Sequence, residues 1–251
     1  MRSVPICIVI PCYNEEQRLP VEDIKRALQN DENIELCLVN DGSSDGTGEI
    51  LKKLALDHPI RVKILELEKN SGKAEAVRQG MLKMAEESTA EFIGYFDADL
   101  ATPLEEARSF VDRIPADNDV VMIAGSRVKL LGSTDIRRLW YRHYFGRIFA
   151  TTVSTMLGLA VYDTQCGAKL FRNTAVKDLF EEAFISKWLF DVEIFYRCLI
   201  TFGRKDAARR IYELNVSRWF EIGGSKIEPG FLLKIPVELW KIRRNYASKI
   251  T

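Results

Sequence analysis

Residues 36–56 have the sequence LCLVNDGSSDGTGEILKKLAL. Residues 36–40 form an apolar run that stops at Asp41 and Gly42, which predicts a buried strand followed by a turn. Residues 47–56 carry apolar side chains at helical spacing, which predicts an amphipathic helix. A strand that passes through a short polar turn into a helix is the repeating unit of α/β proteins.

The same unit recurs across the first half of the chain. Apolar runs that predict further strands lie at residues 4–10, 62–67, 92–96 and 120–124. Segments with helical spacing lie at residues 21–30, 74–87 and 104–114. Such alternation is typical of an α/β fold with a Rossmann-like, mostly parallel sheet that is covered by helices on both faces.

The second half predicts a less regular set of elements. These are a long or broken helix over residues 136–159, a loop from Asp163 into a strand that ends at Phe171, a helix over residues 191–202, a strand over residues 210–216 and a helix over residues 231–246. Pro236 would kink the last helix or begin a new one. No linker is visible in the sequence, so we expect one domain over residues 1–251, with halves at 1–126 and 127–251.

Charge is divided unevenly between these halves. Residues 1–126 carry 14 Lys and Arg against 24 Asp and Glu, whereas residues 127–251 carry 22 against 12. The formal charges of the halves are therefore −10 and +10, which cancel over the whole chain. The basic half is expected to meet an anionic partner, such as a phosphate group or a membrane surface.

Cysteine usage and the lengths of the apolar runs bear on where the protein works. The five cysteines are scattered and contain no C-x-x-C pair: Cys7, Cys12, Cys37, Cys166 and Cys198. Reduced thiols are expected from this pattern. The sequence shows no run of about 20 apolar residues and no signal peptide. These features predict a cytoplasmic protein without a membrane span.

Two aspartates follow the strand predicted at residues 92–96. In open α/β sheets, ligands bind beyond the carboxyl ends of the strands, and Asp97 and Asp99 are expected at that edge. Two carboxylates there suit a hard divalent cation, Mg²⁺ or Mn²⁺, that shares its ligands with substrate phosphates. Capping of the next helix is the alternative role for Asp99. A second Asp-x-Asp pair, Asp117 and Asp119, precedes a strand and is expected at the opposite edge as turn residues.

Several other nucleotide-binding motifs are missing from the sequence. The first predicted strand is not followed by G-x-G-x-x-G, which argues against a dinucleotide site. Gly72-Lys73 resembles the end of a P-loop, but Leu67 stands where that motif has its first glycine, and Ala74 where it has Ser or Thr. No nucleic-acid recognition motif occurs either, so nucleic acid is not an expected partner.

Three motifs, in their order and spacing, resemble the inverting GT-A enzymes of glycosyltransferase family 2. They are residues 9–16 (VIPCYNEE), 39–47 (VNDGSSDGT) and 97–99 (DAD). A closer resemblance is to the dolichyl-phosphate β-glucosyltransferase branch of the polyprenyl-phosphate glycosyltransferases. It rests on residues 70–80 (NSGKAEAVRQG), 97–102 (DADLAT), 125–127 (GSR), 163–171 (DTQCGAKLF), 188–193 (WLFDVE) and 221–226 (EIGGSK).

The resemblance implies a GT-A fold and a metal-dependent hexosyltransferase. The expected donor is a UDP-sugar, UDP-glucose by resemblance, and the expected acceptor is a polyprenyl phosphate of the dolichyl type. The site residues that it implies are Pro11, Tyr13, Glu15 and Asp41 for the uracil and ribose, Lys73 for the nucleotide end of the donor, Asp97 and Asp99 for the metal on the diphosphate, and Arg127 for the acceptor phosphate.

The acceptor decides whether the reaction needs a base. A lipid phosphate is already an anion and needs cations, for which the candidates are Arg127, Arg137, Arg138 and Lys226. A sugar hydroxyl of a polysaccharide or cell-surface glycan needs a base to take its proton, and Asp191 is the first candidate. Pairing with an arginine from a neighbouring loop is an equally good interpretation of Asp191.

Basic segments that are rich in aromatic residues favour the lipid. Residues 137–147 and 231–249 combine Lys and Arg with Trp, Tyr or Phe, as helices at membrane interfaces do. We therefore expect a peripheral protein on the cytosolic membrane face, with a solvated helix face or an oligomer contact as the alternative. A non-catalytic nucleotide-sugar-binding protein is the alternative to an enzyme, and the intact Asp97 and Asp99 pair argues against it.

Overall fold

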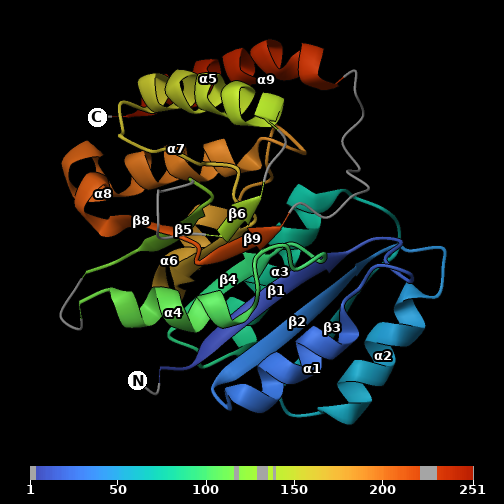
Figure 1. Cartoon of the computed structure of the whole chain (residues 1–251). Coiled ribbons are helices and arrows are strands. Elements are labelled where there is room, and N and C mark those ends of the chain that lie inside the picture. The colour runs from blue at the N-terminus through green and yellow to red at the C-terminus, as the bar shows by residue number, and fades with distance from the viewer. Residues whose placement is uncertain (1–3, 116–118, 129–134, 138–139, 221–230, 251) are drawn as a thin grey trace.

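Strands and helices alternate through the first half of the chain, as predicted (Figure 1). They are β1 (Ile6–Cys12), α1 (Val21–Asn30), β2 (Ile34–Asp41), α2 (Thr47–Asp57), β3 (Val62–Leu67), α3 (Lys73–Glu87), β4 (Phe92–Phe96), α4 (Glu105–Arg113) and β5 (Met122–Ser126). The structure, a computed structural model, describes residues 4–115, 119–128, 135–137, 140–220 and 231–250. For residues 135–137, 140–145 and 231–232 it describes the backbone only.

The second half contributes further strands to the sheet and most of the helices on one side of it. Its elements are β6 (Asp135–Arg137), α5 (Trp140–Leu157), β7 (Ala168–Arg172), α6 (Asn173–Phe180), α7 (Phe190–Phe202), α8 (Arg204–Arg210), β8 (Ile211–Asn215), β9 (Arg218–Phe220), α9 (Phe231–Tyr246) and the short 3₁₀ helix η1 (Ala247–Lys249). The predicted strands and helices at 163–171, 191–202, 210–216 and 231–246 are confirmed as β7, α7, β8 and α9.

Seven strands form one sheet in the order β3-β2-β1-β4-β7-β5-β8, and β6 pairs with β9 separately. Within the large sheet, β7 runs antiparallel to β4 and β5, and the other pairs are parallel. Because β7 runs in the opposite direction, its first residue, Ala168, lies beside Phe96 at the end of β4. The loop that enters β7 therefore reaches the carboxyl edge of the parallel strands.

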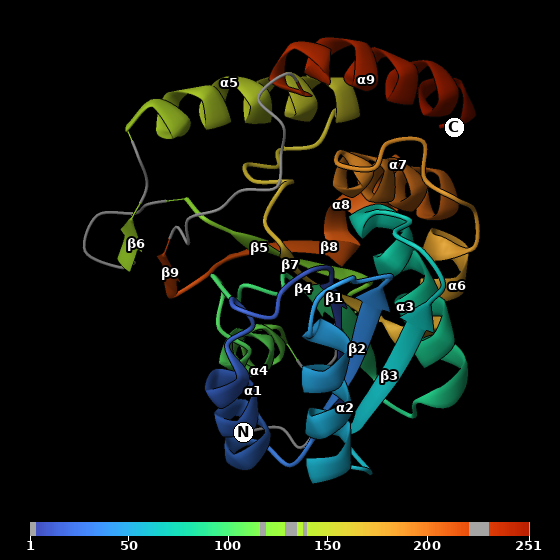
Figure 2. The same cartoon turned by 90° about the vertical axis from the view of Figure 1, so that its right-hand side faces the viewer.

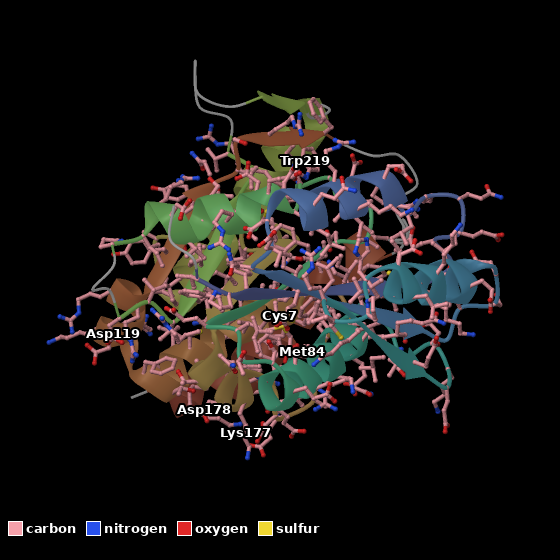
Figure 3. The ribbon with its side chains drawn as sticks, turned by 90° about the horizontal axis from the view of Figure 1, so that it is seen from below. Cys7, Met84, Asp119, Lys177, Asp178 and Trp219 are labelled. Atoms are coloured by element: carbon pink, nitrogen blue, oxygen red, sulfur yellow. The ribbon has the colours of Figure 1, made fainter. Side chains whose placement is uncertain are left out.

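Helices cover both faces of this sheet, which confirms the predicted architecture (Figure 2). Successive side chains of a strand point to opposite faces. Ile6 and Ile8 of β1 accordingly pack in the core with α1, α2 and α4, and Cys7 packs in the other core with α3, α6 and α7. Figure 3 shows Cys7 and Met84 of α3 together in the interior. All five cysteines are buried free thiols, as expected.

Helices α5 and α9 lie at the same end of the molecule, on the side of α7 (Figures 1 and 2). One face of α9 is buried through Leu239, Ile242 and Tyr246, which join the core that contains α7. The helix continues through Pro236, where the sequence predicted a kink or a new helix. Among the described residues, no helix is long and apolar enough to cross a membrane.

The helix predicted over residues 136–159 begins later than expected. Asp135–Arg137 forms β6, which pairs in parallel with β9, and the helix begins at Trp140. This pairing joins segments that are far apart in the chain, so local periodicity does not reveal it. Helices α6 and α8 are also absent from the prediction, because eight and seven residues hold too little helical periodicity to be recognised.

Candidate active site

The loops at the carboxyl edge of the sheet are joined by hydrogen bonds from one loop to the next. The backbone N–H of Asn14 donates to Ser43 Oγ at 3.1 Å, which joins the loops after β1 and β2. Asp97 N–H donates to the carbonyl of Gly167 at 3.0 Å, which joins the end of β4 to the loop that enters β7. The loops after β1 and β2 are therefore held to each other, and so are the end of β4 and the loop before β7.

Lys73 meets Asp97 and Asp99 at the carboxyl edge of the sheet. Lys73 begins α3, and its Nζ lies 2.5 Å from Oδ1 of Asp97. Burial lowers the pKa of Lys73, but the carboxylates of Asp97, Asp191 and Asp99 raise it by more, so the pKa of Lys73 is above its ordinary value. The structure thus brings Lys73 and both aspartates together at this edge of the sheet.

A tight turn sets the direction of Asp99. Leu100 has a φ of 47°, and its N–H donates to the carbonyl of Asp97 at 3.0 Å. The left-handed backbone conformation is about 1 kcal/mol less stable for a leucine than a right-handed one, and such strain is concentrated at functional sites. Ala101 N–H donates to Oδ1 of Asp99 at 3.1 Å, so this carboxylate closes its own turn and does not cap α4.

The two aspartates have the chemistry of a divalent-cation site. Burial, and then the neighbouring carboxylate of Asp97, raise the pKa of Asp99. A cation between the two carboxylates would relieve that repulsion. Within the described residues no cluster of three or more His, Cys, Asp or Glu side chains is arranged to hold a metal. Asp97 and Asp99 therefore fit Mg²⁺ or Mn²⁺ if the remaining ligands are substrate phosphates and water, as is usual for Mg²⁺.

Gly167 provides the space that the Asp97 carboxylate occupies. A Cβ atom on Gly167 would lie 1.9 Å from Oδ2 of Asp97 and 2.2 Å from its carboxyl carbon. A residue with a side chain at this position would displace the carboxylate. The sequence points to Gly167 only through the resemblance of residues 163–171, because its partner Asp97 is distant along the chain.

Asp191 lies in a buried cluster with Lys169 and Tyr95. Nζ of Lys169 and the hydroxyl of Tyr95 each donate to Oδ1 of Asp191 at 2.5 Å. Asp191 is 3% exposed, and Lys169 and Tyr95 are 0% exposed. Burial, and then Asp191, raise the pKa of Tyr95 well above its ordinary value. The partner of Asp191 is thus a lysine rather than the arginine considered from the sequence.

Lys169 and Tyr95 are not among the site residues predicted from the sequence. A lysine within the strand sequence AKLFR of β7, which is buried on both faces, is a signal that could have identified Lys169. Tyr95 lies in the apolar strand FIGYF of β4 and gives no such signal, because tyrosine is common in buried strands.

Asp41 and Glu15, predicted to bind the nucleoside, are buried and hydrogen-bonded. Asp41 is 2% exposed and accepts the backbone N–H groups of Ser71 at 2.7 Å and Gly72 at 2.9 Å. It thereby fixes the loop that precedes Lys73. Glu15 is 6% exposed, and its backbone N–H donates to Thr47 Oγ1 at 2.7 Å.

The other two predicted nucleoside residues, Pro11 and Tyr13, lie at and just beyond the end of β1. Both are half-buried. Arg18, which the sequence analysis missed, lies close by: its Nε is 3.5 Å from Oε2 of Glu15. Its charge also lowers the pKa of Asp99, against the larger upward effects of burial and Asp97. Arg18 therefore adds a second cation beside the carboxylate pair.

Arg127 is held by a two-pronged ion pair. Its Nε and Nη2 donate to the two carboxylate oxygens of Asp163 at 2.7 and 2.8 Å, and its guanidinium lies 5.5 Å from the ring centre of Trp219. Burial lowers the pKa of Arg127, but the carboxylate of Asp163 raises it by more, and Cys166 and then Asp97 add smaller upward effects, so the net shift of the pKa is upward. The guanidinium thus remains charged and lies within the electrostatic reach of Asp97.

Three other residues were predicted to bind an acceptor phosphate. Arg137 ends β6, with only its backbone described, so the structure does not place its guanidinium. Arg138 and Lys226 lie outside the described residues. Of the predicted acceptor residues, the structure therefore brings Arg127 to the site.

Two polar atoms in the loop that enters β7 are buried without a partner in the described part of the chain. They are Oγ1 of Thr164 and Nε2 of Gln165. Their neighbours in the loop are Asp163, which binds Arg127, and Gly167, which contacts Asp97. Buried polar atoms are almost always hydrogen-bonded, so a bound ligand is a natural partner for these two groups.

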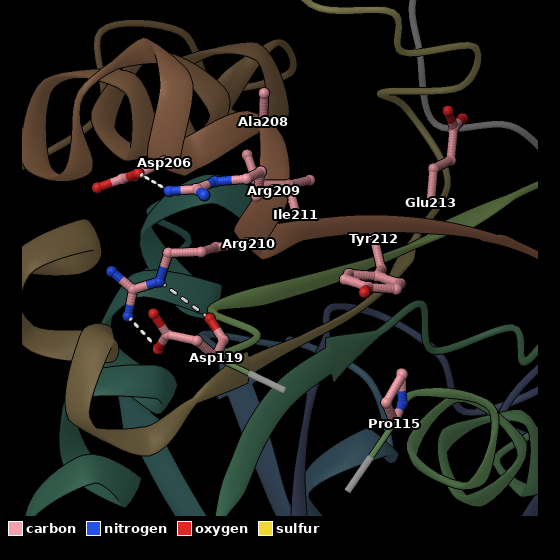
Figure 4. A pocket seen from close by; sticks show the side chains of 9 residues that line it. All are labelled: Pro115, Asp119, Asp206, Ala208, Arg209, Arg210, Ile211, Tyr212 and Glu213. Carbon is pink, nitrogen blue, oxygen red and sulfur yellow. Dashed lines mark hydrogen bonds and ion pairs between the residues drawn. The ribbon is translucent and has the colours of Figure 1, made fainter. Parts of the chain in front are cut away.

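A separate hollow lies at the opposite end of the sheet (Figure 4). It is lined by residues such as Pro115, Tyr212 and Asp119, and the carboxylate of Asp119 is 2.7 Å from Arg210 Nη2. The position of Asp119 agrees with the prediction that the second Asp-x-Asp pair stands at the opposite edge; Asp117 lies outside the described residues. Because its charges are paired to each other, this hollow is a poor candidate for the active site.

The sequence has clear relatives among known proteins. The profile of the family described as Glycosyl transferase family 2 matches residues 7–180. A dolichyl-phosphate beta-glucosyltransferase of Trichomonas vaginalis is 34% identical over 245 residues, which are 93% of this chain and 69% of that protein. The dolichyl-phosphate beta-glucosyltransferase of Homo sapiens is 31% identical over 257 residues, covering 97% of this chain and 76% of that protein.

Solved structures share the fold at low sequence identity. Glucosyl-3-phosphoglycerate synthase from Mycobacterium tuberculosis, in complex with Mn²⁺, UDP-glucose and phosphoglyceric acid, superposes with a TM-score of 0.69. The match covers 96% of this chain and 80% of that chain at 15% sequence identity. This likeness confirms the predicted GT-A fold.

Proposed function

Because the chain belongs to glycosyl transferase family 2, we propose that it transfers glucose from UDP-glucose to the phosphate of a polyprenyl lipid of the dolichyl type. The observation that carries this proposal is the placement of Asp97 and Asp99 beside Lys73 at the carboxyl edge of the sheet. The dolichyl-phosphate beta-glucosyltransferases among the relatives support glucose and a lipid phosphate as the two substrates.

The donor would bind with its diphosphate at the two aspartates. Asp97 and Asp99 would hold Mg²⁺ or Mn²⁺, which when bound neutralises charge on the departing diphosphate. Lys73 and Arg18 would bind the same phosphates from the protein side. The nucleoside would lie against the loops after β1 and β2, which hold Pro11, Tyr13, Glu15 and Asp41. Each oxygen of Asp41 keeps accepting capacity beyond its one backbone partner, which suits a further donor from the uracil or ribose.

The surroundings of Asp191 favour a phosphate acceptor over a glycan hydroxyl. A hydroxyl acceptor needs a base within hydrogen-bond reach of its proton. Asp191 is 3% exposed, and its Oδ1 already accepts hydrogen bonds from Lys169 and Tyr95. A phosphate oxygen is an anion and can attack without losing a proton, so this acceptor needs no base. It needs cations, and Arg127 is the first, with Arg137, Arg138 and Lys226 as further candidates.

The exposed face of α9 supports action at a membrane surface. Leu233, Val237 and Trp240 recur at helical spacing and are 85%, 53% and 57% exposed. Exposed lysines and arginines flank them: Lys234, Lys241, Arg243 and Arg244. An apolar stripe edged by cations matches the interface of an anionic membrane. On this proposal residues 1–126 bind the nucleotide sugar, and residues 127–251 bind the acceptor on the cytosolic membrane face.

The proposal is tested by transfer of radiolabelled glucose from UDP-glucose to polyprenyl phosphate in vesicles, with Mn²⁺ or with EDTA. We expect an organic-phase product that needs the metal and that falls about 100-fold or more in Asp99→Asn. Asp119→Asn, in the other Asp-x-Asp pair, is the matched control and should keep full activity. Equal activity in the two variants would contradict the proposal.

A further inference from the structure

A lysine, an aspartate and a tyrosine form a buried cluster next to the loop that carries Gly167. Nζ of Lys169, which is 0% exposed, lies 2.5 Å from Oδ1 of Asp191 and 2.5 Å from the carbonyl oxygen of Cys166. The hydroxyl of Tyr95 donates to the same Asp191 oxygen. A buried charged group keeps its place only while its partners are present, so these contacts fix the position of the lysine ammonium.

The backbone leads from this cluster directly to Asp97. Lys169 holds the carbonyl of Cys166, and the next carbonyl, of Gly167, accepts the backbone N–H of Asp97 at 3.0 Å. The Cα of Gly167 also faces the Asp97 carboxylate so closely that a Cβ atom would overlap it at 1.9 Å. A small rotation of the Cys166–Gly167 peptide would therefore move both the backbone and the carboxylate of Asp97.

We propose that Lys169 is a positioning residue, which holds the Cys166 carbonyl with Asp191 as its counter-ion and so places the Asp97 carboxylate for the cation and the diphosphate of the donor. This inference rests on the proposed function. It also assigns Asp191 a role through Lys169, in place of the role of base for an acceptor hydroxyl. Substitution of a residue that orients the ligands of a metal usually lowers the affinity for that metal by about 10- to 100-fold.

The affinity for the cation in Lys169→Met should change in opposite directions, depending on whether Lys169 acts through its charge alone or by positioning Asp97. Removal of a positive charge near a cation site strengthens cation binding if charge is its only effect. Loss of positioning weakens the binding. The double variant Lys169→Met/Asp191→Asn removes both charges of the pair and leaves no unpaired charge of this pair in the core. Its affinity for the cation can therefore be measured even if the single variant does not fold.

The experiment measures the affinity for Mn²⁺ in the presence of UDP, from the electron paramagnetic resonance signal of free Mn²⁺. We expect the affinity to fall about 10- to 100-fold in Lys169→Met and to remain as low in the double variant. The matched control is Arg108→Met, which breaks the ion pair with Asp31 at the opposite edge of the sheet. It should keep the affinity within about twofold of that of the wild-type protein, because distant sites act independently.

Two outcomes would overturn the inference and leave the proposed function intact. One is tighter Mn²⁺ binding in Lys169→Met, and the other is unchanged binding in the double variant. Wild-type protein that binds no Mn²⁺ with UDP would instead overturn the proposed function, and the inference with it. The assay contains no acceptor, so a failure of the lipid-phosphate hypothesis does not affect its result.

Discussion

The ammonium of Lys73 lies 2.5 Å from Oδ1 of Asp97, so the first residue of α3 and the first residue after β4 share one ion pair. A metal ion would need the same carboxylate. Lys73 would therefore compete with the cation until the diphosphate of the donor forms an ion pair with its ammonium. On the proposed function, Lys73 would then leave Asp97 to the metal and bind the donor phosphates.

Lys73→Met should separate binding of the metal from binding of the donor. Without the competing ammonium, Mn²⁺ alone should bind more tightly. The affinity for UDP-glucose should fall about 10- to 100-fold, which corresponds to the loss of one charged hydrogen bond. Titration calorimetry with Mn²⁺ and then with UDP-glucose measures both. Lys83→Met, which removes an exposed pair with Glu87 farther along α3, should change neither affinity; weaker binding of Mn²⁺ alone in Lys73→Met would contradict the account.

Gly167→Ala should lower activity more than it lowers stability. The added Cβ would overlap the Asp97 carboxylate, which is the end of a flexible side chain and can swing away. We expect glucose transfer to fall about 100-fold, as for the loss of one transition-state contact. The midpoint of urea unfolding should change little. A variant that transfers glucose normally would show that the position of this carboxylate is unimportant.

Trp240→Glu should detach the protein from anionic vesicles without loss of donor binding. Trp240 is 57% exposed on the apolar stripe of α9, and Arg244 lies over its ring. Removal of one large apolar contact should weaken vesicle binding in a sedimentation assay about 10-fold or more. Ile60→Glu is the matched control, because Ile60 is 87% exposed but lies outside α9. Equal loss in both variants would argue against α9 as the membrane contact.

The pair Arg108 and Asp31 should make stability depend on acid pH. Burial raises the pKa of Asp31, but hydrogen bonds from Arg108 and Asn33 lower it by more, so the folded pKa lies below the unfolded one. The resulting stabilisation is fully present above the unfolded pKa and is lost as the pH falls through the folded pKa. Arg108→Met should therefore be less stable than the wild type by about 1 kcal/mol at neutral pH.

That difference should vanish as the pH falls below the lowered pKa of Asp31 in the folded wild type, where Asp31 is protonated in both proteins. Urea unfolding at a series of pH values measures it. Arg26→Met breaks an exposed ion pair with Asp23 on α1, and it should lower the free energy of unfolding by only about 0.3 kcal/mol at neutral pH. A difference between wild type and Arg108→Met that stays constant with pH would contradict the assignment of this pair.

Local patterns in the sequence were sufficient to predict most of the fold. Residues 36–56 gave a strand, a turn and a helix in the places where β2 and α2 occur, because both elements have apolar spacing and a polar stop between them. The pairing of β6 with β9 could not be predicted, since it depends on a contact between distant segments. The antiparallel direction of β7 is likewise a property of the whole sheet and not of its five residues.

The candidate site was predictable to the extent that it follows the ends of strands. Asp97, Asp99 and Lys73 stand where the topology of an α/β sheet places ligand-binding residues. The cluster of Lys169 and Tyr95 with Asp191 was not predictable, because it joins β7, β4 and α7 through side chains in the core. From the sequence, Asp191 could equally be a base or the ion-pair partner of an arginine, and its burial between two donors is a property that only the packed structure gives.

On the proposed function, the acceptor is a lipid phosphate. The most direct test supplies UDP-glucose and Mn²⁺ with vesicles that contain either polyprenyl phosphate or the same polyprenol without phosphate, and identifies the lipid product by mass spectrometry. We expect a glucosyl phosphate lipid from the first vesicles and no glucosylated lipid from the second. Glucosylation of the phosphate-free polyprenol, or of a glycan hydroxyl when the lipid phosphate is left unmodified, would contradict it.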